Sequence, residues 1–334
     1  MILVTGATGF VGSHLLYCLS AQGKKIVALK RAGSRIENTE EIFSFYNSVL
    51  GKHDNIIWEN GDVLDYFSLE DIFSKYQITE IYNCSGMISF EKSDYDLLHI
   101  VNRDAVAHLV NLAIDYHVSK FCHFSSVAAI SPSKNESILN EDSKWKYSPN
   151  LTGYALSKYA GECEIWRGVQ EGLNAVILNP SVIIGPGCWN RGSGLIVSQA
   201  KKGFRFYTTG GTGVVDVRDV INIAFYLMEN NIFSQRFILN SDNLNFKKLF
   251  TISNSFFGHR PPSIKISKVM FVLALRIERI LSVFNGKKPL LASEFLKSGF
   301  GVTNYSSEKI VRLMNYTFIK PEESFAWACS LFKN

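Results

Sequence analysis

A tyrosine and a lysine four residues apart suggest the first chemistry in this sequence. They stand in the stretch "YALSK" as Tyr154 and Lys158, and on a helix this spacing places both side chains on one face. A phenol has a pKa of about 10, and a nearby ammonium group lowers that pKa by stabilising the phenolate. The pair is therefore a candidate proton donor to the oxygen of a carbonyl group whose carbon receives hydride. The alternative is an ordinary surface helix.

Two serines could share this chemistry. Ser125 and Ser126 follow a predicted strand in the stretch "FSSV". In a parallel sheet, ligands bind beyond the carboxyl ends of the strands. Either hydroxyl could therefore form a hydrogen bond with the substrate oxygen and with Tyr154. The alternative is that these serines cap the turn after the strand.

A glycine-rich turn opens the chain. In "MILVTGATGFVGSHLL", the apolar run 2–4 reads as a buried strand, and the apolar residues from Val11 onward have helical spacing. Gly6 permits the tight turn, Gly9 permits close approach of a pyrophosphate, and Gly12 permits close packing of the helix on the strand. The helix N-terminus offers free N–H groups to phosphate. The turn therefore predicts a dinucleotide site.

The end of the second predicted strand bears on the choice of cofactor. It reads "VALKRAGSR", with Lys30, Arg31, Ser34 and Arg35 and no carboxylate to hold a ribose 2′-hydroxyl. Guanidinium groups bind a 2′-phosphate through charge-assisted hydrogen bonds. The sequence therefore favours NADP(H), and NAD(H) stays open because basic residues after a surface strand can simply be solvated.

Strands and helices must alternate to position these residues. Further strands are predicted in "KKIVALKR", "NIIWENGDVLD", "EIYNCSG", "KFCHFSSVAAI" and "NAVILNPSVIIGPG". Helices are predicted at 68–76, with Ser68 and Asp71 as a capping box, and at 101–118 and 154–172. This order predicts an α/β fold, a Rossmann-type doubly wound parallel sheet with a smaller, mostly helical C-terminal substrate-binding region.

The predicted domain boundary falls near residue 185. Residues 1–185 form the dinucleotide-binding domain, to which 212–240 return, and 186–211 with 241–334 form the substrate-binding region. The stretch "GGTG" at 210–213 lacks a following Gly-Lys-Ser/Thr, so it is interpreted as a turn and not as a phosphate-binding loop.

Five motifs together resemble a known family. "TGATGFVG", "GDVLD", "FSSV", "YALSK" and "NPSVIIGPG" occur in an order and at separations similar to those of the extended short-chain dehydrogenase/reductases, the NAD(P)-dependent epimerase/dehydratase family. The resemblance covers roughly residues 1–240 and, less fully, the tail. "ALKR" and "NPSVIIGPG" are most similar to dihydroflavonol-reductase-like and 3β-hydroxysteroid-dehydrogenase-like members.

The resemblance implies roles at matching positions. Ser126, Tyr154 and Lys158 would be catalytic, with Lys158 also binding the nicotinamide ribose, and Asn102 would support the active site. The implied cofactor-binding residues are Gly6, Thr8, Gly9, Phe10, Val11, Gly12, Lys30, Arg31, Arg35, Asp62, Val63, Cys84, Ser85, Gly86, Tyr154, Lys158, Pro180 and Ser181. Of these, Arg31 would hold the 2′-phosphate, and Asp62 with Val63 would flank the adenine.

Two departures from the family pattern bear on the substrate. The "GT" of the family's "VNxxGT" helix is Ala105-Val106 here, and the "VYG" expected after the serine strand is "AAI" at 128–130. Sugar-nucleotide epimerases commonly carry that tyrosine, and 4,6-dehydratases carry an acidic pair after the serine. Substrate contacts are expected from 87–96, 131–150, 186–210 and the C-terminal region.

These residues leave three alternative functions open. The first is an NADP(H)-dependent oxidoreductase that reduces a carbonyl, or oxidises a secondary alcohol, on a small apolar or aromatic substrate. The second is an NAD-dependent sugar-nucleotide epimerase or dehydratase. The third is a non-enzymatic member that uses the dinucleotide fold for binding, against which the intact Ser126, Tyr154 and Lys158 set argues.

Composition narrows the partners and the compartment. The chain has 334 residues and a net charge of +5, without a long Lys/Arg run, so no nucleic-acid partner is expected. Its six cysteines stand singly, which favours the cytoplasm, and its seven histidines show no metal-ligand spacing.

The apolar stretch 268–288 is interrupted by charged residues, so it is interpreted as a core helix rather than a membrane span. An interfacial helix or a pocket wall is the alternative. A homodimer stays open.

Overall fold

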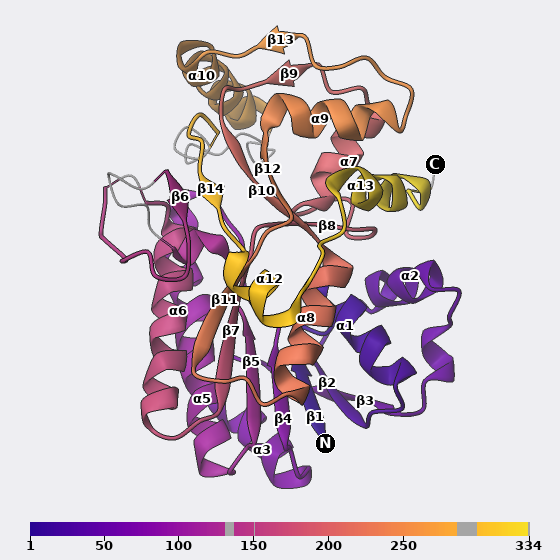
Figure 1. Cartoon of the computed structure of the whole chain (residues 1–334), viewed down its shortest axis with the longest axis vertical. Helices are drawn as coiled ribbons and strands as arrows, with labels where there is room; N and C mark the ends of the chain where they lie inside the picture. The colour runs from indigo at the N-terminus through magenta and orange to yellow at the C-terminus, as the bar shows by residue number, and fades with distance from the viewer. Residues whose placement is uncertain (131–136, 150, 286–298, 333–334) are drawn as a thin grey trace.

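The structure is a computed structural model that describes residues 1–130, 137–149, 151–285 and 299–332, with 279–285 described as backbone only. Parts of the predicted substrate loop 131–150 and of the predicted helix 268–288 therefore lie outside the described residues. The molecule has a lower α/β part and an upper part built from the later chain (Figure 1).

A seven-stranded parallel sheet forms the centre of the lower part. Its strands are β1 (Ile2–Thr5), β2 (Ile26–Lys30), β3 (Ile56–Asn60), β4 (Glu80–Asn83), β5 (Lys120–Phe124), β7 (Ala175–Pro180) and β11 (Gln235–Leu239). The order is β11-β7-β5-β4-β1-β2-β3, so the chain winds outward in both directions from β1 and β4. This is the predicted doubly wound fold, and such sheets bind ligands where the strand order reverses. The edge strand β11 was not among the predicted strands.

Helices cover both faces of this sheet. They are α1 (Phe10–Ala21), α2 (Glu37–Phe45), α3 (Tyr66–Lys75), α4 (Tyr95–His99), α5 (Ala105–Asp115), α6 (Gly153–Gln170) and α8 (Val217–Glu229). Val4 and Ala28 pack with α1 and α8 on one face, whereas their neighbours Leu3 and Val27 pack with α3, α5 and α6 on the other. The strands are hydrophobic on both sides because both faces are buried.

Four predicted elements differ from the structure. The helix predicted from Ser68 begins at Tyr66, because Asp65 is the N-cap and accepts a hydrogen bond from the Ser68 N–H, so the predicted capping box is wrong. The helix predicted at 101–118 follows α4 and contains a π-helical turn, η3 (Ile100–Asp104), before α5 begins. The stretch "GGTG" is largely strand, because β10 (Gly211–Asp216) begins within it.

The fourth difference is the predicted last strand, which is two strands in two sheets. β7 ends at Pro180, and β8 (Val182–Ile184) pairs instead with β10 in a three-stranded sheet completed by β12 (Asp242–Asn245). Between them, Ser181 donates its backbone N–H to Leu239 O on β11. The chain therefore leaves the central sheet at Ser181, close to the predicted ligand edge.

The later chain builds the upper part. Its elements are α7 (Gly194–Lys201), β9 (Phe206–Tyr207), α9 (Phe246–Ser255), β13 (Ile264–Lys265), α10 (Lys268–Asn285), β14 (Asn304–Tyr305), α12 (Glu308–Met314) and α13 (Pro321–Ser330). β13 pairs with β9, and β14 pairs with β6 (Ile138–Leu139). Figure 1 shows α9 and α10 at the top of the molecule, with α13 below them. Short strands thus accompany the helices that the sequence predicts there.

The helix α10 is only partly a core helix. Its Phe271 and Leu275 side chains are buried, but Val269, Leu273 and Ile277 are exposed. The core-helix interpretation therefore holds for one face of its described part and is wrong for the other.

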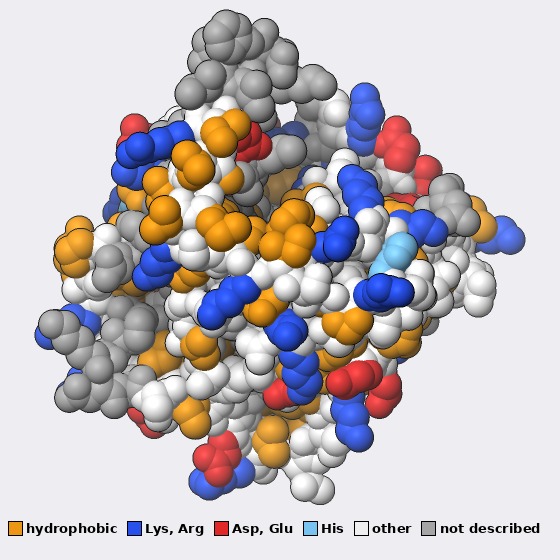
Figure 2. Space-filling model, turned by 90° about the horizontal axis from the view of Figure 1, so that it is seen from above, with side chains coloured by type: hydrophobic (Ala, Val, Ile, Leu, Met, Phe, Trp, Pro, Cys, Tyr) orange, Lys and Arg blue, Asp and Glu red, His pale blue; other side chains and the backbone are white. Residues whose placement is uncertain are grey.

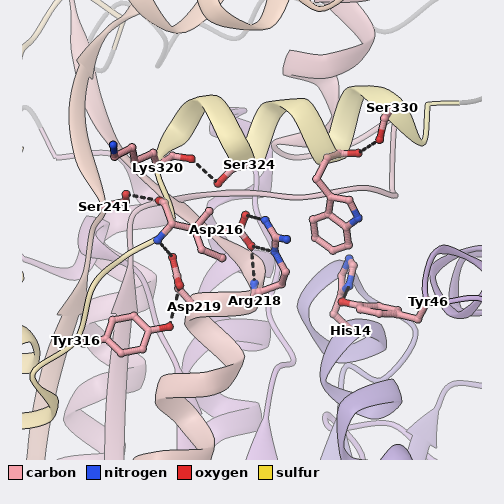
Figure 3. A network of polar contacts seen from close by, with 12 residues as sticks. His14, Tyr46, Asp216, Arg218, Asp219, Ser241, Tyr316, Lys320, Ser324 and Ser330 are labelled. Atoms are coloured by element: carbon pink, nitrogen blue, oxygen red, sulfur yellow. Dashed lines mark hydrogen bonds and ion pairs between the residues drawn. The ribbon is translucent and has the colours of Figure 1, made fainter.

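A polar network fastens the C-terminal segment to the lower part (Figure 3). Asp219 on α8 accepts hydrogen bonds from the Tyr316 hydroxyl at 2.8 Å and from the Ile319 N–H at 3.0 Å. The Arg218 guanidinium lies 4.3 Å from the ring centroid of Trp327 on α13. The last helix is therefore held against α8 by charge, hydrogen bonds and an aromatic contact.

The first helix joins the same network. His14 is buried, with Nε2 2.9 Å from Pro186 O and Nδ1 2.7 Å from the Tyr46 hydroxyl, and its ring lies 5.9 Å from that of Trp327. Because the carbonyl of Pro186 can only accept, Nε2 carries the proton and Nδ1 accepts from Tyr46. Burial lowers the pKa of His14 to about 4, so the ring is neutral at pH 7. His14 therefore has a structural role in this network.

Candidate active site

The glycine-rich turn requires glycine at two positions. Gly6 has φ +63°, and a Cβ there would lie 2.6 Å from the Cys84 carbonyl group. A Cβ at Gly12 would lie 2.1 Å from Gly6 O, because α1 packs directly on the turn. α1 begins at Phe10 with Gly9 as its N-cap residue, and the first N–H groups of a helix have no partner within it. The turn therefore fits a pyrophosphate group.

The ends of β2 and β3 line a hollow beside this turn. Its volume is about 550 Å³, and its lining includes Arg31, Ser34, Asp62 and Asp65. Arg31 is exposed, and no ion pair engages it within the described residues. Asp62 Oδ1 accepts from the Leu64 N–H, and Asp65 caps α3, so both carboxylates are used locally. The hollow can hold an adenosine group with a guanidinium at its edge.

Ser126 and Tyr154 meet beyond the end of β5. The Ser126 side chain lies close enough to the Tyr154 phenol to lower its pKa, and Ser126 Oγ accepts from the Ala128 N–H at 3.1 Å. Ser126 is thus placed near the phenol, and it also caps the next turn. Ser125 does not face the phenol, because its hydroxyl donates to Glu162.

The pKa of Tyr154 differs from the sequence-based expectation. Burial raises the pKa of this phenol, and the hydrogen bond from Ser126 partly opposes that shift. The expected lowering by Lys158 is absent, because Lys158 Nζ donates to Phe124 O at 3.1 Å instead. Burial lowers the pKa of Lys158 to about 8, so its ammonium group is poised to lose a proton near neutral pH. Both groups are therefore desolvated.

Asn102 is held at the π-helical turn that interrupts the predicted helix. Its side-chain amide accepts from the Met87 N–H at 2.8 Å and donates to Met87 O and to Ser157 Oγ, each at 2.9 Å. The amide therefore ties the segment after β4 to α6, the helix that carries Tyr154. Isolated π-turns often occur at functional sites because they redirect a side chain out of the regular helix.

Gly86 lies between the side chains of Lys158 and Asn102. A Cβ at Gly86 would lie 3.1 Å from Lys158 Nζ and 3.3 Å from Asn102 Oδ1. The absent side chain therefore leaves a small space, the Gly86 cradle, in front of the lysine ammonium.

The remaining predicted residues lie along the same edge of the sheet. Ser85 follows β4, and its hydroxyl donates to Asn83 Oδ1 at 2.5 Å. Ser181 Oγ donates to Leu239 O at 3.1 Å beyond Pro180, the last residue of β7. The residues predicted from strand ends are thus at the carboxyl edge that binds ligands in this fold. Val63 packs with the core beneath that edge.

A buried carboxylate behind the lysine was missed by sequence reasoning. Glu162 is fully buried and accepts hydrogen bonds from Ser125 Oγ and Asn179 Nδ2, both at 2.5 Å, and its other oxygen lies 3.3 Å from Arg236 Nη1. Its position four residues after Lys158, on the same helix face, was the available signal. Burial raises the pKa of Glu162, and the neighbouring donors and cations oppose that rise.

Two other residues near the site were also missed. Arg191 Nη2 donates to Thr8 O in the glycine-rich turn over 3.4 Å, although 183 residues separate them. Phe90 lies with its ring centroid 6.0 Å from that of Tyr154. Both residues lie in loops with mixed polar sequence, and nothing in that local sequence indicates either contact.

Within the described part of the chain, no group of three or more His, Cys, Asp or Glu side chains is arranged to hold a metal ion. No helix among the same residues combines the length and apolarity needed to cross a membrane.

The chain is similar in sequence and fold to several known proteins. A Synechocystis sp. protein provisionally named dihydroflavonol 4-reductase is 24% identical over 340 residues, covering 99% of this chain and 94% of that protein. "dTDP-4-dehydro-6-deoxy-D-allose reductase" from Streptomyces sp. is 25% identical over 283 residues, covering 79% and 83%. The crystal structure of gox2253 superposes with a TM-score of 0.79 at 24% identity, covering 99% and 97% of the two chains.

The family model described as "NAD dependent epimerase/dehydratase family" matches residues 2–237, most of the chain. The chain therefore belongs to this family and is an NAD(P)-dependent oxidoreductase of the extended short-chain dehydrogenase/reductase type.

Proposed function

We propose that the protein is an NADP(H)-dependent reductase that converts a carbonyl group on a small apolar or aromatic substrate to an alcohol, or catalyses the reverse oxidation. The observation that carries the proposal is the placement of the Ser126 side chain beside the Tyr154 phenol beyond the end of β5, with the buried Lys158 on the same helix as Tyr154. A bound nicotinamide supplies hydride to the carbonyl carbon, or accepts it in the reverse direction.

In the reduction, the phenol of Tyr154 gives its proton to the carbonyl oxygen as the carbon accepts hydride, so the product is a neutral alcohol. The Ser126 hydroxyl, which lies beside this phenol, donates to the same carbonyl oxygen. Lys158 donates to Phe124 O and would hold the nicotinamide ribose rather than act on the phenol directly. The residues proposed to hold the cofactor are those named from the sequence, and the Gly86 cradle faces Lys158.

Exposed Arg31 supports NADP(H) over NAD(H), since it stands beside the hollow at the ends of β2 and β3 without an ion-pair partner among the described residues. The segments 186–211 and 241–334 are proposed to form the substrate-binding region. A cytoplasmic location and a homodimer stay predictions.

The test is a fluorescence titration of the purified protein with NADPH and with NADH. We expect tighter binding of NADPH, and Arg31→Ala should weaken it about 10-fold to 100-fold while leaving NADH binding unchanged, as expected for loss of a charge-assisted contact. Lys24→Ala, an exposed lysine at the other end of β2, is the matched control. Equal affinity for both cofactors, unaltered by Arg31→Ala, would contradict the NADP(H) assignment.

A sugar-nucleotide epimerase or dehydratase is the second candidate. It is favoured by relatives named for sugar reactions, including "UDP-glucose 4-epimerase" of Yersinia enterocolitica, which is 32% identical over 92 residues, covering 28% of this chain and 26% of that protein. Such enzymes regenerate the cofactor in each turnover. Protein purified with NAD already bound, and turnover of a nucleotide sugar without added cofactor, would favour this candidate over the reductase.

A further inference from the structure

The top of the molecule, on the outer side of the proposed substrate-binding region, carries an exposed face that is both apolar and basic. We define the cap face as residues 201–207 and 246–278, which include α9, β9, β13 and the described side chains of α10. Figure 2 views the molecule from this side and shows hydrophobic side chains lying among Lys and Arg side chains. The face is continuous, because β13 pairs with β9 and Ile266, just before α10, donates its N–H to Tyr207 O.

The apolar part of the cap face is a helical stripe. On α10, the exposed fractions are 78% for Val269, 50% for Met270, 58% for Leu273 and 50% for Ile277. These positions fall within about 100° of the helix circumference, and the buried Phe271 lies on the opposite side. The helix is thus anchored by one apolar face and presents a second one outward. A contiguous exposed apolar surface of this kind marks an interaction site.

The charge of the cap face is strongly one-sided. It holds nine Lys and Arg residues and a single acidic residue, Glu278, whereas the rest of the chain holds 26 Lys and Arg against 29 Asp and Glu. All nine basic side chains are exposed, and Lys248 has an ion-pair partner, Asp242 at 3.4 Å. The basic residues are Lys201, Lys202, Arg205, Lys247, Lys248, Arg260, Lys265, Lys268 and Arg276.

We propose that the cap face docks on the surface of a membrane that contains anionic lipids, with α10 lying in the plane of the interface. Aliphatic side chains on one helix face gain by entering the acyl boundary, and the surrounding cations gain near anionic headgroups. A second copy of the chain fits this face less well, because a symmetric contact would bring nine cations against nine. Nucleic acid offers phosphate anions, but it offers no apolar environment for the side chains of Val269, Leu273 and Ile277.

The test is co-sedimentation of the full chain with sucrose-loaded vesicles of phosphatidylcholine, with and without one-quarter phosphatidylglycerol. We expect binding to the anionic vesicles to be at least about 10-fold tighter, and to weaken as salt rises, since salt screens the headgroup charge. Equal or absent binding to the two vesicle types would overturn the proposal.

Two variants separate the apolar and the electrostatic contributions. Val269→Ser/Leu273→Ser/Ile277→Ser should reduce binding to anionic vesicles at least about 10-fold, because it removes the inserted surface. Its matched control is Phe67→Ser on α3, which is 75% exposed and lies outside the cap face, and which should bind as the unaltered chain does. Lys265→Glu/Lys268→Glu/Arg276→Glu should abolish the preference for anionic vesicles.

Other outcomes would assign the face to a different partner. If the serine variant binds vesicles normally but the charge variant loses binding to a single-stranded RNA oligonucleotide, the face binds nucleic acid instead. If the unaltered chain is a dimer that the serine variant converts to a monomer, with no vesicle binding by either, the face joins two copies. Circular dichroism and thermal unfolding should match across all variants, because the altered side chains are exposed.

Discussion

Glu162 Oε1 accepts a hydrogen bond from the Ser125 hydroxyl at 2.5 Å, in the buried layer directly behind the candidate catalytic residues. The same oxygen accepts from Asn179, whose side chain also donates to Ser126 O at 2.9 Å. One carboxylate therefore joins the ends of β5 and β7 to α6, the helix that carries Tyr154. The position of Ser126 relative to Tyr154 depends on this junction.

Glu162→Gln should shift the pH dependence of activity. The negative charge of Glu162 raises the pKa of Lys158 and opposes the lowering caused by burial. Without that charge, the pKa of Lys158 should fall below about 8, and the limb of the kcat profile that reports its ionisation should move to lower pH by about one unit. Glu164→Gln, on the same helix but paired with Arg167 and Arg103, should leave the profile in place.

An unchanged profile for Glu162→Gln would mean that this carboxyl already holds a proton in the folded chain. The junction would then be neutral, and its part in the site would be limited to hydrogen bonding.

Tyr154→Phe should lower kcat by about 10²–10⁴-fold, the range found for loss of a general acid. NADPH binding by the variant should change little, because the ring remains. Tyr159→Phe is the matched control on the same helix, since Tyr159 stacks on Trp145 at 4.0 Å. Steady-state kinetics and cofactor titration of both variants are the measurements. Retention of full activity by Tyr154→Phe would remove this residue from the proposed mechanism.

Gly86→Ala should impair catalysis by crowding the lysine. The added methyl would meet Lys158 Nζ at 3.1 Å and Asn102 Oδ1 at 3.3 Å, so one of them must move. We expect kcat to fall about 10-fold or more, since small displacements of positioned groups carry large kinetic costs. Gly51→Ala, where an added methyl meets nothing within 4 Å, should be kinetically silent. Equal activity of the two variants would show that the cradle tolerates a side chain.

Asp219→Asn should remove part of the pH dependence of stability. Burial raises the pKa of Asp219 from 3.8 to about 6, so the folded chain favours its protonated form. The contribution of this group to the free energy of unfolding is fully present below pH 3.8 and is lost as pH rises through about 6. The loss amounts to about 3 kcal/mol. An asparagine can donate to Tyr316 and accept from Ile319 without ionising.

The measurement is the free energy of unfolding in urea between pH 4 and 7. The difference between the original chain and Asp219→Asn should grow in favour of the variant as pH rises. Asp71→Asn, at an exposed position on α3, serves as the control and should track the original chain. A pH-independent difference would place the effect in packing and not in ionisation.

The sequence predicts the parts of this site that arise from local physics. The turn at Gly6, Gly9 and Gly12 follows from backbone sterics, and the pairing of Tyr154 with Lys158 follows from helix geometry. The strand ends follow from the alternation of apolar runs. These features need no knowledge of distant contacts, which is why the family and the fold could be inferred together.

The features that were missed depend on contacts between distant segments. The strand break at Ser181 reflects competition between two sheets, one of which contains β12, more than 55 residues later. Arg191 reaches Thr8 across the fold. The π-turn at Asn102 is compatible with a regular helical pattern, so periodicity could not reveal it. For the same reason, apolar spacing in α10 could not distinguish an inward face from an outward one.

The contact of His14 and Arg218 with Trp327 has a consequence for how the protein is made. The first helix of the chain and the last one belong to a single packed layer, with α8 between them (Figure 3). A ribosome adds Trp327 313 residues after His14. The parallel sheet, whose strand β11 ends at Leu239, can therefore form before this layer closes.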